Sequence, residues 1–137
     1  MQILQNKAVR TIGRYVQDVH DTCACFTSLK LLNVGQIRDY QAAVFVFQCM
    51  NGLAPDVFKS FYQTNSDLHN YGTRHSSDIV VDLRHGTRSS FSIKHLGTSV
   101  GNELPVSIRA AEHVPQFKKK LKDYFLGGIN VEFYYGW

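Results

Sequence analysis

The segment GQIRDYQAAVFVFQCMNG, residues 35–52, constrains the fold of this 137-residue chain more than any other stretch. Apolar residues recur along one side of it at intervals of three and four, the period of an amphipathic α-helix: Ile37, Tyr40, Val44, Phe47 and Met50. Between positions 43 and 47 such a helix is apolar nearly all round, which predicts burial on several sides. Asn51-Gly52 supplies a stop signal. We therefore expect other parts of the chain to cover several sides of this helix.

The composition is that of a globular chain. Hydrophobic residues make up 44% and aromatic residues 12%, which is enough for one core, and the length suits one domain. No apolar run approaches the roughly 18–20 residues that span a bilayer, and residues 1–14 lack the apolar core of a secretory signal. Three cysteines, an odd number, favour a reducing compartment. We expect an intracellular location, nuclear or cytoplasmic, with no secretion and no membrane partner.

Residues 3–16, ILQNKAVRTIGRYV, predict an amphipathic N-terminal helix. Its expected packed side is Leu4, Ala8, Ile12 and Tyr15. Its opposite side holds three cations, because spacings of three and four return to one face: Lys7, Arg10 and Arg14. These cations are either a surface for a polyanion or the solvated side of a packed helix.

Further helices are predicted on both sides of the central one. CACFTSLKLL, residues 23–32, can begin at Asp21 or Thr22 as N-cap, and Pro55 suits the start of a short helix, DVFKSFY. Near the C-terminus, VPQFKKKLKDYFL has Pro115 in its first turn. Its apolar side is Phe117, Leu121, Tyr124 and Phe125, and lysines cover the rest: Lys118, Lys119, Lys120 and Lys122.

Between these helices the periodicity changes from helix to strand. DIVVDLR, residues 78–84, is β-branched, HGTR forms a turn around Gly86, and SSFSIKH, residues 89–95, alternates. This pattern predicts a β-hairpin, and residues 96–105 are either a weak helix or a loop. The expected fold class is α+β: a mainly helical N-terminal half of three to four helices, then a small β-hairpin and a C-terminal basic amphipathic helix. We divide the chain into a helical, thumb-like segment (1–63), a polar connector (64–78), a hairpin-plus-helix segment (79–126) and an aromatic tail (127–137).

The polar stretch HNYGTRHSSD, residues 69–78, is either a chemical site or a joint between two parts of the fold. Zinc is a poor fit, because Cys23-x-Cys25 beside His20 lacks the paired ligand arms of structural zinc sites. A metal nuclease would use Asp78 and Asp82 with Lys94, but the acidic residue expected two positions before the lysine is Ser92. A strand with its polar face in water explains these residues better. No metal site and no catalytic residue is therefore assigned.

Basic residues surround the predicted hairpin, among them Arg74, Arg84, Arg88, Lys94 and Arg109, and the net charge is +4. Tyr71 and Phe91 could stack on bases, as aromatic residues do in single-strand binders. Contacts from such cations to phosphates would give a salt-sensitive affinity that tolerates any sequence. The alternative is a positive surface that binds nothing.

The order of several segments resembles the C-terminal region of non-LTR (LINE-type) retrotransposon reverse transcriptases of the jockey or CR1-like kind. The segments are LQNKAVRTIG, then LKLLNVGQIRDYQAAVFVFQCMNGLAPDVFKSFY, LHNYGTRHSSD, SFSIKHLGTSVGNELP and FKKKLKDYFL. Together they cover the chain from about Leu4 to Leu126. Leu-Gln-x-Lys-Ala-x-Arg, Tyr-x-Thr-Arg and Phe-Lys-x-x-Leu-Lys carry the resemblance jointly.

The resemblance implies a region that follows the polymerase palm, with thumb-like helices that hold template, primer or target nucleic acid. The catalytic Ala-Asp-Asp motif is missing from this chain, so we expect no activity alone and no cofactor, whereas the palm domain would use Mg²⁺. Where this family carries Leu-Trp-Asn, the chain reads Val100, Gly101 and Asn102, which predicts looser packing around Leu104 and Pro105. In the resembling family, the position of Met1 would lie in the middle of a longer polypeptide. We therefore expect this chain to be a fragment of a decayed retrotransposon, read as a small open reading frame.

The expected function is thus a non-catalytic part of an RNA-directed DNA polymerase that assists nucleic-acid binding. Its partners would be RNA or DNA and the upstream polymerase domain, with no small-molecule substrate. The alternative is a structural remnant that packs on that domain and has no activity of its own. Tyr71 and Arg74 are expected to fix the polar joint. The candidate nucleic-acid-binding residues are Lys7, Arg10, Arg14, Arg74, Arg84, Arg88, Lys118, Lys119 and Lys122.

Overall fold

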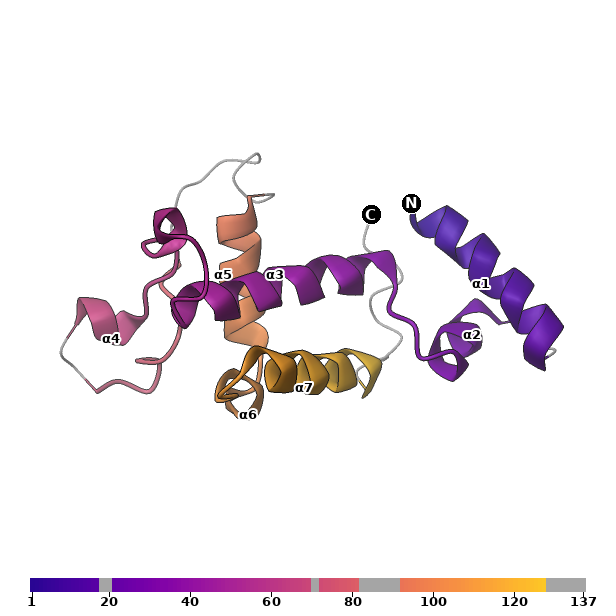
Figure 1. The fold of residues 1–137 in the computed structure, drawn as a ribbon. Coiled ribbons are helices and arrows are strands. Elements are labelled where there is room, and N and C mark those ends of the chain that lie inside the picture. Colours follow the sequence, from indigo (N-terminus) through magenta and orange to yellow (C-terminus); the bar gives the residue numbers. More distant parts are fainter. Residues whose placement is uncertain (18–20, 70–71, 82–91, 128–137) are drawn as a thin grey trace. The chain divides into compact units, whose positions relative to one another are not determined.

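A computed structural model describes residues 1–17, 21–69, 72–81 and 92–127 (Figure 1). The helices among them are α1 (Gln2–Gln17), α2 (Thr22–Ser28), α3 (Val34–Met50), the 3-10 helix η1 (Asp56–Phe58), α4 (Asn65–Leu68), α5 (Ile93–Glu103), α6 (Val106–Arg109) and α7 (Val114–Gly127). They belong to two compact units. The first holds Met1–Arg38 and the chain from Leu121 onward, and the second holds Asp39–Lys120. Within the described ranges, no helix is long and apolar enough to cross a membrane.

The central helix predicted from the sequence is confirmed as α3. Asn33 and Gln36 cap its start reciprocally: the Asn33 Oδ1 accepts from the Gln36 N–H at 2.8 Å, and the Gln36 Oε1 accepts from the Asn33 N–H at 3.0 Å. At its end, Gly52 adopts a φ of +68°, and the Leu53 N–H donates to the Gln48 carbonyl, which is a Schellman stop. Its buried residues are Ala42, Ala43, Val44, Val46, Phe47 and Cys49, so the helix is buried on several sides as expected.

The predicted β-hairpin is wrong, and the described portion of the chain is mostly helical with no strand pairing beyond one isolated bridge. Ile93 to His95, assigned to the second strand, form the first turn of α5, where the Ser92 side chain accepts from the His95 N–H as N-cap. Ile79, assigned to the first strand, instead pairs with Thr64. The expected turn at HGTR lies outside the described residues. An alternation of only five residues was outweighed by the cap and by helical spacing that continues to Glu103.

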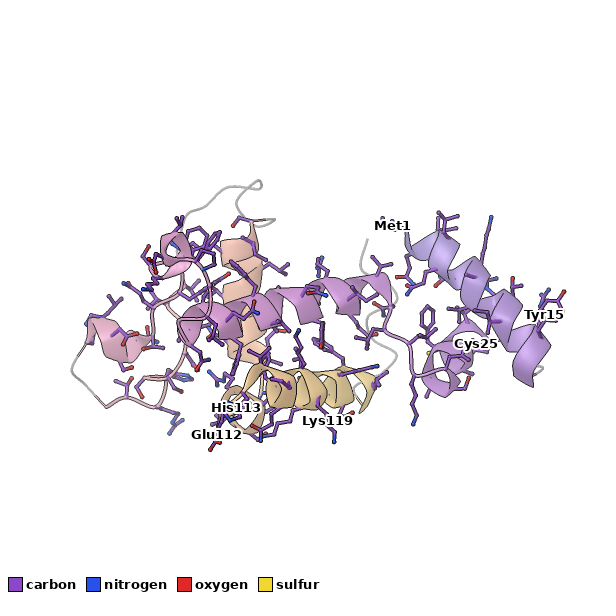
Figure 2. All side chains as sticks on the ribbon, viewed as in Figure 1. Met1, Tyr15, Cys25, Glu112, His113 and Lys119 are labelled. Carbon is purple, nitrogen blue, oxygen red and sulfur yellow. The ribbon has the colours of Figure 1, made fainter. Side chains whose placement is uncertain are left out.

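In the first unit, α1 packs on α2, but with a different side from the one predicted. The buried side of α1 contains Val9 and Gly13, and Val9 joins a cluster with Cys25, Phe26 and Leu29. Polar side chains extend the same contact: the Gln5 Nε2 donates to the Leu32 carbonyl at 2.8 Å. Figure 2 shows Cys25 between the two helices. Gly13 is buried on this side of α1, although glycine weakens the helix itself.

In the second unit, α5 crosses α3 at close range (Figure 1). A Cβ atom at Gly97 would overlap the Tyr62 hydroxyl and would lie 2.7 Å from the Val46 Cγ2, and one at Gly101 would lie 2.8 Å from the Ile79 Cδ1. The core around this crossing comprises Val46, Cys49, Tyr62 and Ile79, with Phe45, Ala54, Phe58 and Phe61 packed against it. The absence of two side chains from one face of α5 is what allows this approach.

The region around Leu104 is tightly packed, contrary to the expectation from the missing tryptophan. Leu104 is 3% exposed and Val100 7%. Gly101 occupies the position where the resembling family carries the large side chain, and the Ile79 side chain lies directly against it. Packing from Ile79 therefore replaces the expected anchor.

Candidate nucleic-acid interface

One face of α1 carries three basic side chains. Lys7, Arg10 and Arg14 are all exposed, and the 16 residues of the helix include no acidic one. Within the described portion of the chain, no carboxylate forms an ion pair with these three side chains. Arg14 also lies in the last turn, where a cation interacts favourably with the helix dipole. The structure thus groups the three predicted cations on one solvent-facing surface, which we call the α1 basic face.

The residues expected to pack beneath this face are instead exposed. Leu4 is 70% exposed, Ile12 44% and Tyr15 88%, and Ala8 is exposed too. Figure 2 shows Tyr15 near the end of α1, pointing away from α2. The four side chains follow helical spacing and form an apolar stripe adjacent to the α1 basic face. The prediction of a simple two-sided helix was therefore wrong: α1 has a packed, a basic and an apolar exposed side.

The lysines of α7 form a second exposed set. Lys118, Lys119 and Lys122 are exposed, and Lys119 points outward from its helix in Figure 2. Lys120 is half-buried and its Nζ donates to the Ser107 carbonyl at 3.2 Å, so it has a structural contact. The predicted apolar side is confirmed for Phe117 and Leu121, which are 2% and 0% exposed, whereas Tyr124 is 41% exposed. Three of the four α7 lysines are therefore exposed to solvent.

Of the other residues predicted from the sequence, several lie outside the described residues, and Arg74 is the described one that was expected to fix the joint. Arg74 is exposed and has no hydrogen bond or ion pair among the described residues, so it does not hold the joint through backbone carbonyls. Tyr71, Arg84 and Arg88 lie outside the described residues, as do Phe91 and Asp82. The structure thus leaves the Arg74 side chain open to solvent.

The 69–78 stretch ends in a polar joint built on Asp78. The Asp78 carboxylate pairs with the His75 Nδ1 at 2.8 Å and with the Arg109 guanidinium at 3.0 Å. The Asn65 N–H donates to the Asp78 carbonyl, and the Asn65 side chain donates to the His75 carbonyl. Because Asp78 already has two basic partners, it is a poor candidate for the metal ligand of a nuclease. At Asp78, the contacts support the interpretation of residues 69–78 as a polar joint and not as a chemical site.

The neighbouring residue Ile79 is held by a two-point side-chain clamp. The Asn102 Oδ1 accepts from the Ile79 N–H at 2.8 Å, and the Asn102 Nδ2 donates to the Ile79 carbonyl at 2.9 Å. These partners are 23 positions apart in sequence, and Asp78 and Arg109 are 31 apart. No local pattern reveals such pairs, which is why the sequence did not identify Asn102 and Arg109 as the residues of the joint.

Metal ligation finds no support in the described residues. No three His, Cys, Asp or Glu side chains there come together in a group that could hold an ion. The three cysteines form no disulfide, and Cys25 and Cys49 are buried. Burial raises the pKa of the Cys49 thiol, which disfavours the reactive thiolate.

Asp78 is expected to give the fold an acid-sensitive contact. The hydrogen bond from His75, and then that from Arg109, lower the pKa of the Asp78 carboxyl below its ordinary 3.8. A lowered pKa stabilises the fold above the unfolded value, and this stabilisation is lost as the pH falls through the folded value. Asp78→Asn should therefore lower the free energy of unfolding by about 1–2 kcal/mol at pH 7, and the deficit should shrink below pH 3.8. Urea unfolding followed by circular dichroism between pH 7 and pH 2.5 measures it.

The matched control is Asp56→Asn. Asp56 pairs at 2.7 Å with Lys59, but both side chains are mostly exposed, at 89% and 63%, so its removal should cost under about 0.5 kcal/mol at any pH. A deficit for Asp78→Asn that stays constant from pH 7 to pH 2.5 would contradict the role given to the Asp78 charge.

Comparisons with protein-family models, with curated proteins and with solved structures found no match to this chain. The likeness to the retrotransposon region thus depends on the sequence motifs alone.

Proposed function

We propose that this chain is a non-catalytic nucleic-acid-binding module, of the kind that follows the palm in a LINE-type RNA-directed DNA polymerase. The α1 basic face carries the proposal. Three exposed cations on one helix, with no acidic residue in that helix, form an electrostatic surface suited to consecutive phosphates. The motifs that resemble the retrotransposon family begin within the same helix.

Two further features support binding to a flexible strand. Tyr15 is 88% exposed next to Arg14, and an exposed ring beside a cation can stack on a base while the cation contacts a phosphate. Lys118, Lys119 and Lys122 on α7 offer a second set of phosphate contacts. Because both sets would contact phosphates through charge, we expect an affinity that tolerates sequence.

A second candidate function is a structural module that packs on a polymerase domain. The apolar stripe of α1 favours it, because Leu4, Ile12 and Tyr15 leave contiguous apolar surface in water, and such surfaces commonly serve protein contacts. In that case the basic residues would merely border the interface. The two candidates differ in whether the isolated chain binds nucleic acid.

The test is binding of the purified chain to labelled single-stranded RNA and to an RNA–DNA hybrid, across a salt series. Each phosphate contact to a single strand contributes roughly 0.7 to the slope of log affinity against log salt. Changing Lys7, Arg10 and Arg14 together to glutamine should therefore reduce that slope by roughly 2 and weaken binding at least about tenfold at low salt.

Two variants provide controls. Changing Lys118, Lys119 and Lys122 to glutamine measures separately how much the α7 lysines contribute to nucleic-acid affinity and to its salt dependence. A double change of Lys30 and Lys59, which are exposed and outside both sets, should leave the slope nearly unchanged. Absence of binding at low salt, by a chain whose helical content is intact, would exclude the proposal and leave the structural module.

A further inference from the structure

The exposed surface of α1 has a feature that nucleic-acid binding leaves unexplained. Beside the α1 basic face lies the apolar stripe of Leu4, Ala8, Ile12 and Tyr15, all of them exposed. A strand of RNA that neutralised the cations would leave Leu4 and Ile12 in water, where an apolar side chain is unfavourable. The stripe therefore indicates a partner that takes up apolar and cationic side chains together.

The two surfaces are continuous along the helix. Leu4 and Lys7 are three positions apart, so they are neighbours on the helix surface. Thr11 is in turn a neighbour of both Arg14 and Tyr15. The Thr11 hydroxyl donates to the Lys7 carbonyl at 2.9 Å, so its hydrogen is already bonded within the helix. Apolar and basic side chains thus form one exposed surface, separate from the side of α1 that packs on α2.

The charge and the polarity of this surface match an anionic bilayer. A helix that lies in the membrane interface inserts its apolar side chains at the level where headgroups meet acyl chains, and its lysines and arginines reach the headgroups. The Tyr15 ring suits the same level, because tyrosine has an apolar body and a polar tip. The three cations of α1, with no acidic residue in the helix, are complementary to anionic headgroups. A bilayer offers these apolar and anionic groups on one flat surface.

We propose that α1 binds the surface of anionic bilayers, with the apolar stripe inserted in the interface and the cations of the α1 basic face at the headgroups. The sequence-based expectation of no membrane partner follows from the lack of a segment that crosses a bilayer, and a surface helix needs none. This inference goes beyond the proposed function and does not depend on it, although both use Lys7, Arg10 and Arg14.

The experiment measures co-sedimentation of the full chain with two kinds of vesicle: phosphatidylcholine with roughly one quarter phosphatidylserine, and phosphatidylcholine alone. We expect binding to the mixed vesicles and at least about tenfold weaker binding to phosphatidylcholine alone. Changing Lys7, Arg10 and Arg14 together to glutamine should weaken binding to the mixed vesicles roughly a hundredfold, because each cation near an anionic surface contributes about fivefold.

A double variant tests the apolar stripe. Leu4→Gln with Ile12→Gln should weaken binding to the mixed vesicles at least about tenfold, because these side chains no longer gain by leaving water, while RNA affinity stays unchanged. The matched control is Leu53→Gln with Val57→Gln, which alters two exposed apolar residues of the other unit and should leave vesicle binding unchanged. Circular dichroism verifies that every variant folds.

Three results would each overturn the proposal: the folded chain binds neither kind of vesicle, it binds both kinds equally, or the stripe variant and its control bind the mixed vesicles alike. In the last case the stripe does not enter the bilayer and is left to protein contacts. RNA binding is measured on the same preparations, so a chain that binds RNA but not vesicles separates failure of this inference from failure of the proposed function.

Discussion

Replacing Phe117 by alanine is expected to lower the free energy of unfolding by about 3–5 kcal/mol, the largest loss from any single substitution considered for this chain. Phe117 is 2% exposed, and its ring stacks on that of Phe47 with centroids 4.3 Å apart and planes 17° apart. The truncation would remove this stack and leave a cavity, and the surrounding helices could close the space only in part. Urea unfolding followed by circular dichroism at 222 nm measures the change.

Two substitutions test whether burial is the cause. Phe117→Leu retains most of the volume and should cost only about 1.5 kcal/mol. Tyr124→Ala, on the same helix but at a position 41% exposed, should cost under about 1 kcal/mol, since it loses mainly its ring contact with Phe125. Equal losses for Phe117→Ala and Tyr124→Ala would show that α7 does not pack through Phe117.

Replacing Gly97 by alanine should lower the free energy of unfolding by about 3 kcal/mol, at the upper end of overpacking effects. In an open helix the same change would stabilise the fold by about 0.5–1 kcal/mol, because alanine is the better helix former. Here the new methyl group would overlap the Tyr62 hydroxyl and lie 2.7 Å from the Val46 Cγ2. Tyr62 cannot move aside without losing its 2.8 Å hydrogen bond to the Ile93 carbonyl. The steric cost therefore exceeds the gain in propensity.

Gly127→Ala is the matched control. Gly127 is also helical, at the end of α7, and a Cβ atom there would meet nothing within 4 Å, so this change should be neutral or slightly stabilising. Tyr62→Phe in the Gly97→Ala background should recover part of the loss, because it removes the hydroxyl that the methyl group meets. A Gly97→Ala variant as stable as the parent would exclude the close α3–α5 crossing.

The same crossing explains why residues 93–103 form a helix and not the predicted hairpin. Phe91, Ile93 and His95 alternate with polar residues over a span too short to distinguish a strand from one turn of helix. Ser92 can cap a helix as readily as it can occupy a strand. What decided the outcome was the face formed by Gly97 and Gly101, which fits against Val46 and Ile79 only if the backbone is helical.

The orientation of α1 was mispredicted for a related reason. Hydrophobicity placed Leu4, Ile12 and Tyr15 inside, yet Val9 is the residue that packs on α2. Gln2 and Gln5 complete that contact by hydrogen bonds to the backbone at Val34 and Leu32. Amide side chains that satisfy the backbone of a neighbouring segment can outweigh apolar spacing, but nothing local in the sequence marks which glutamines will do so.

By itself the sequence determined those features that depend on near neighbours along the chain. It determined that α1, α2, α3 and α7 are helices and where α3 ends, and it grouped Lys7, Arg10 and Arg14 on one face, because caps, stops and helical spacing act within a few residues. Only the tertiary structure decided that residues 93–103 are helical, which side of α1 is buried, and that Asp78 and Arg109 form the joint. Those outcomes depend on contacts between residues far apart in sequence, whose free energies exceed the small local preferences that a sequence pattern expresses.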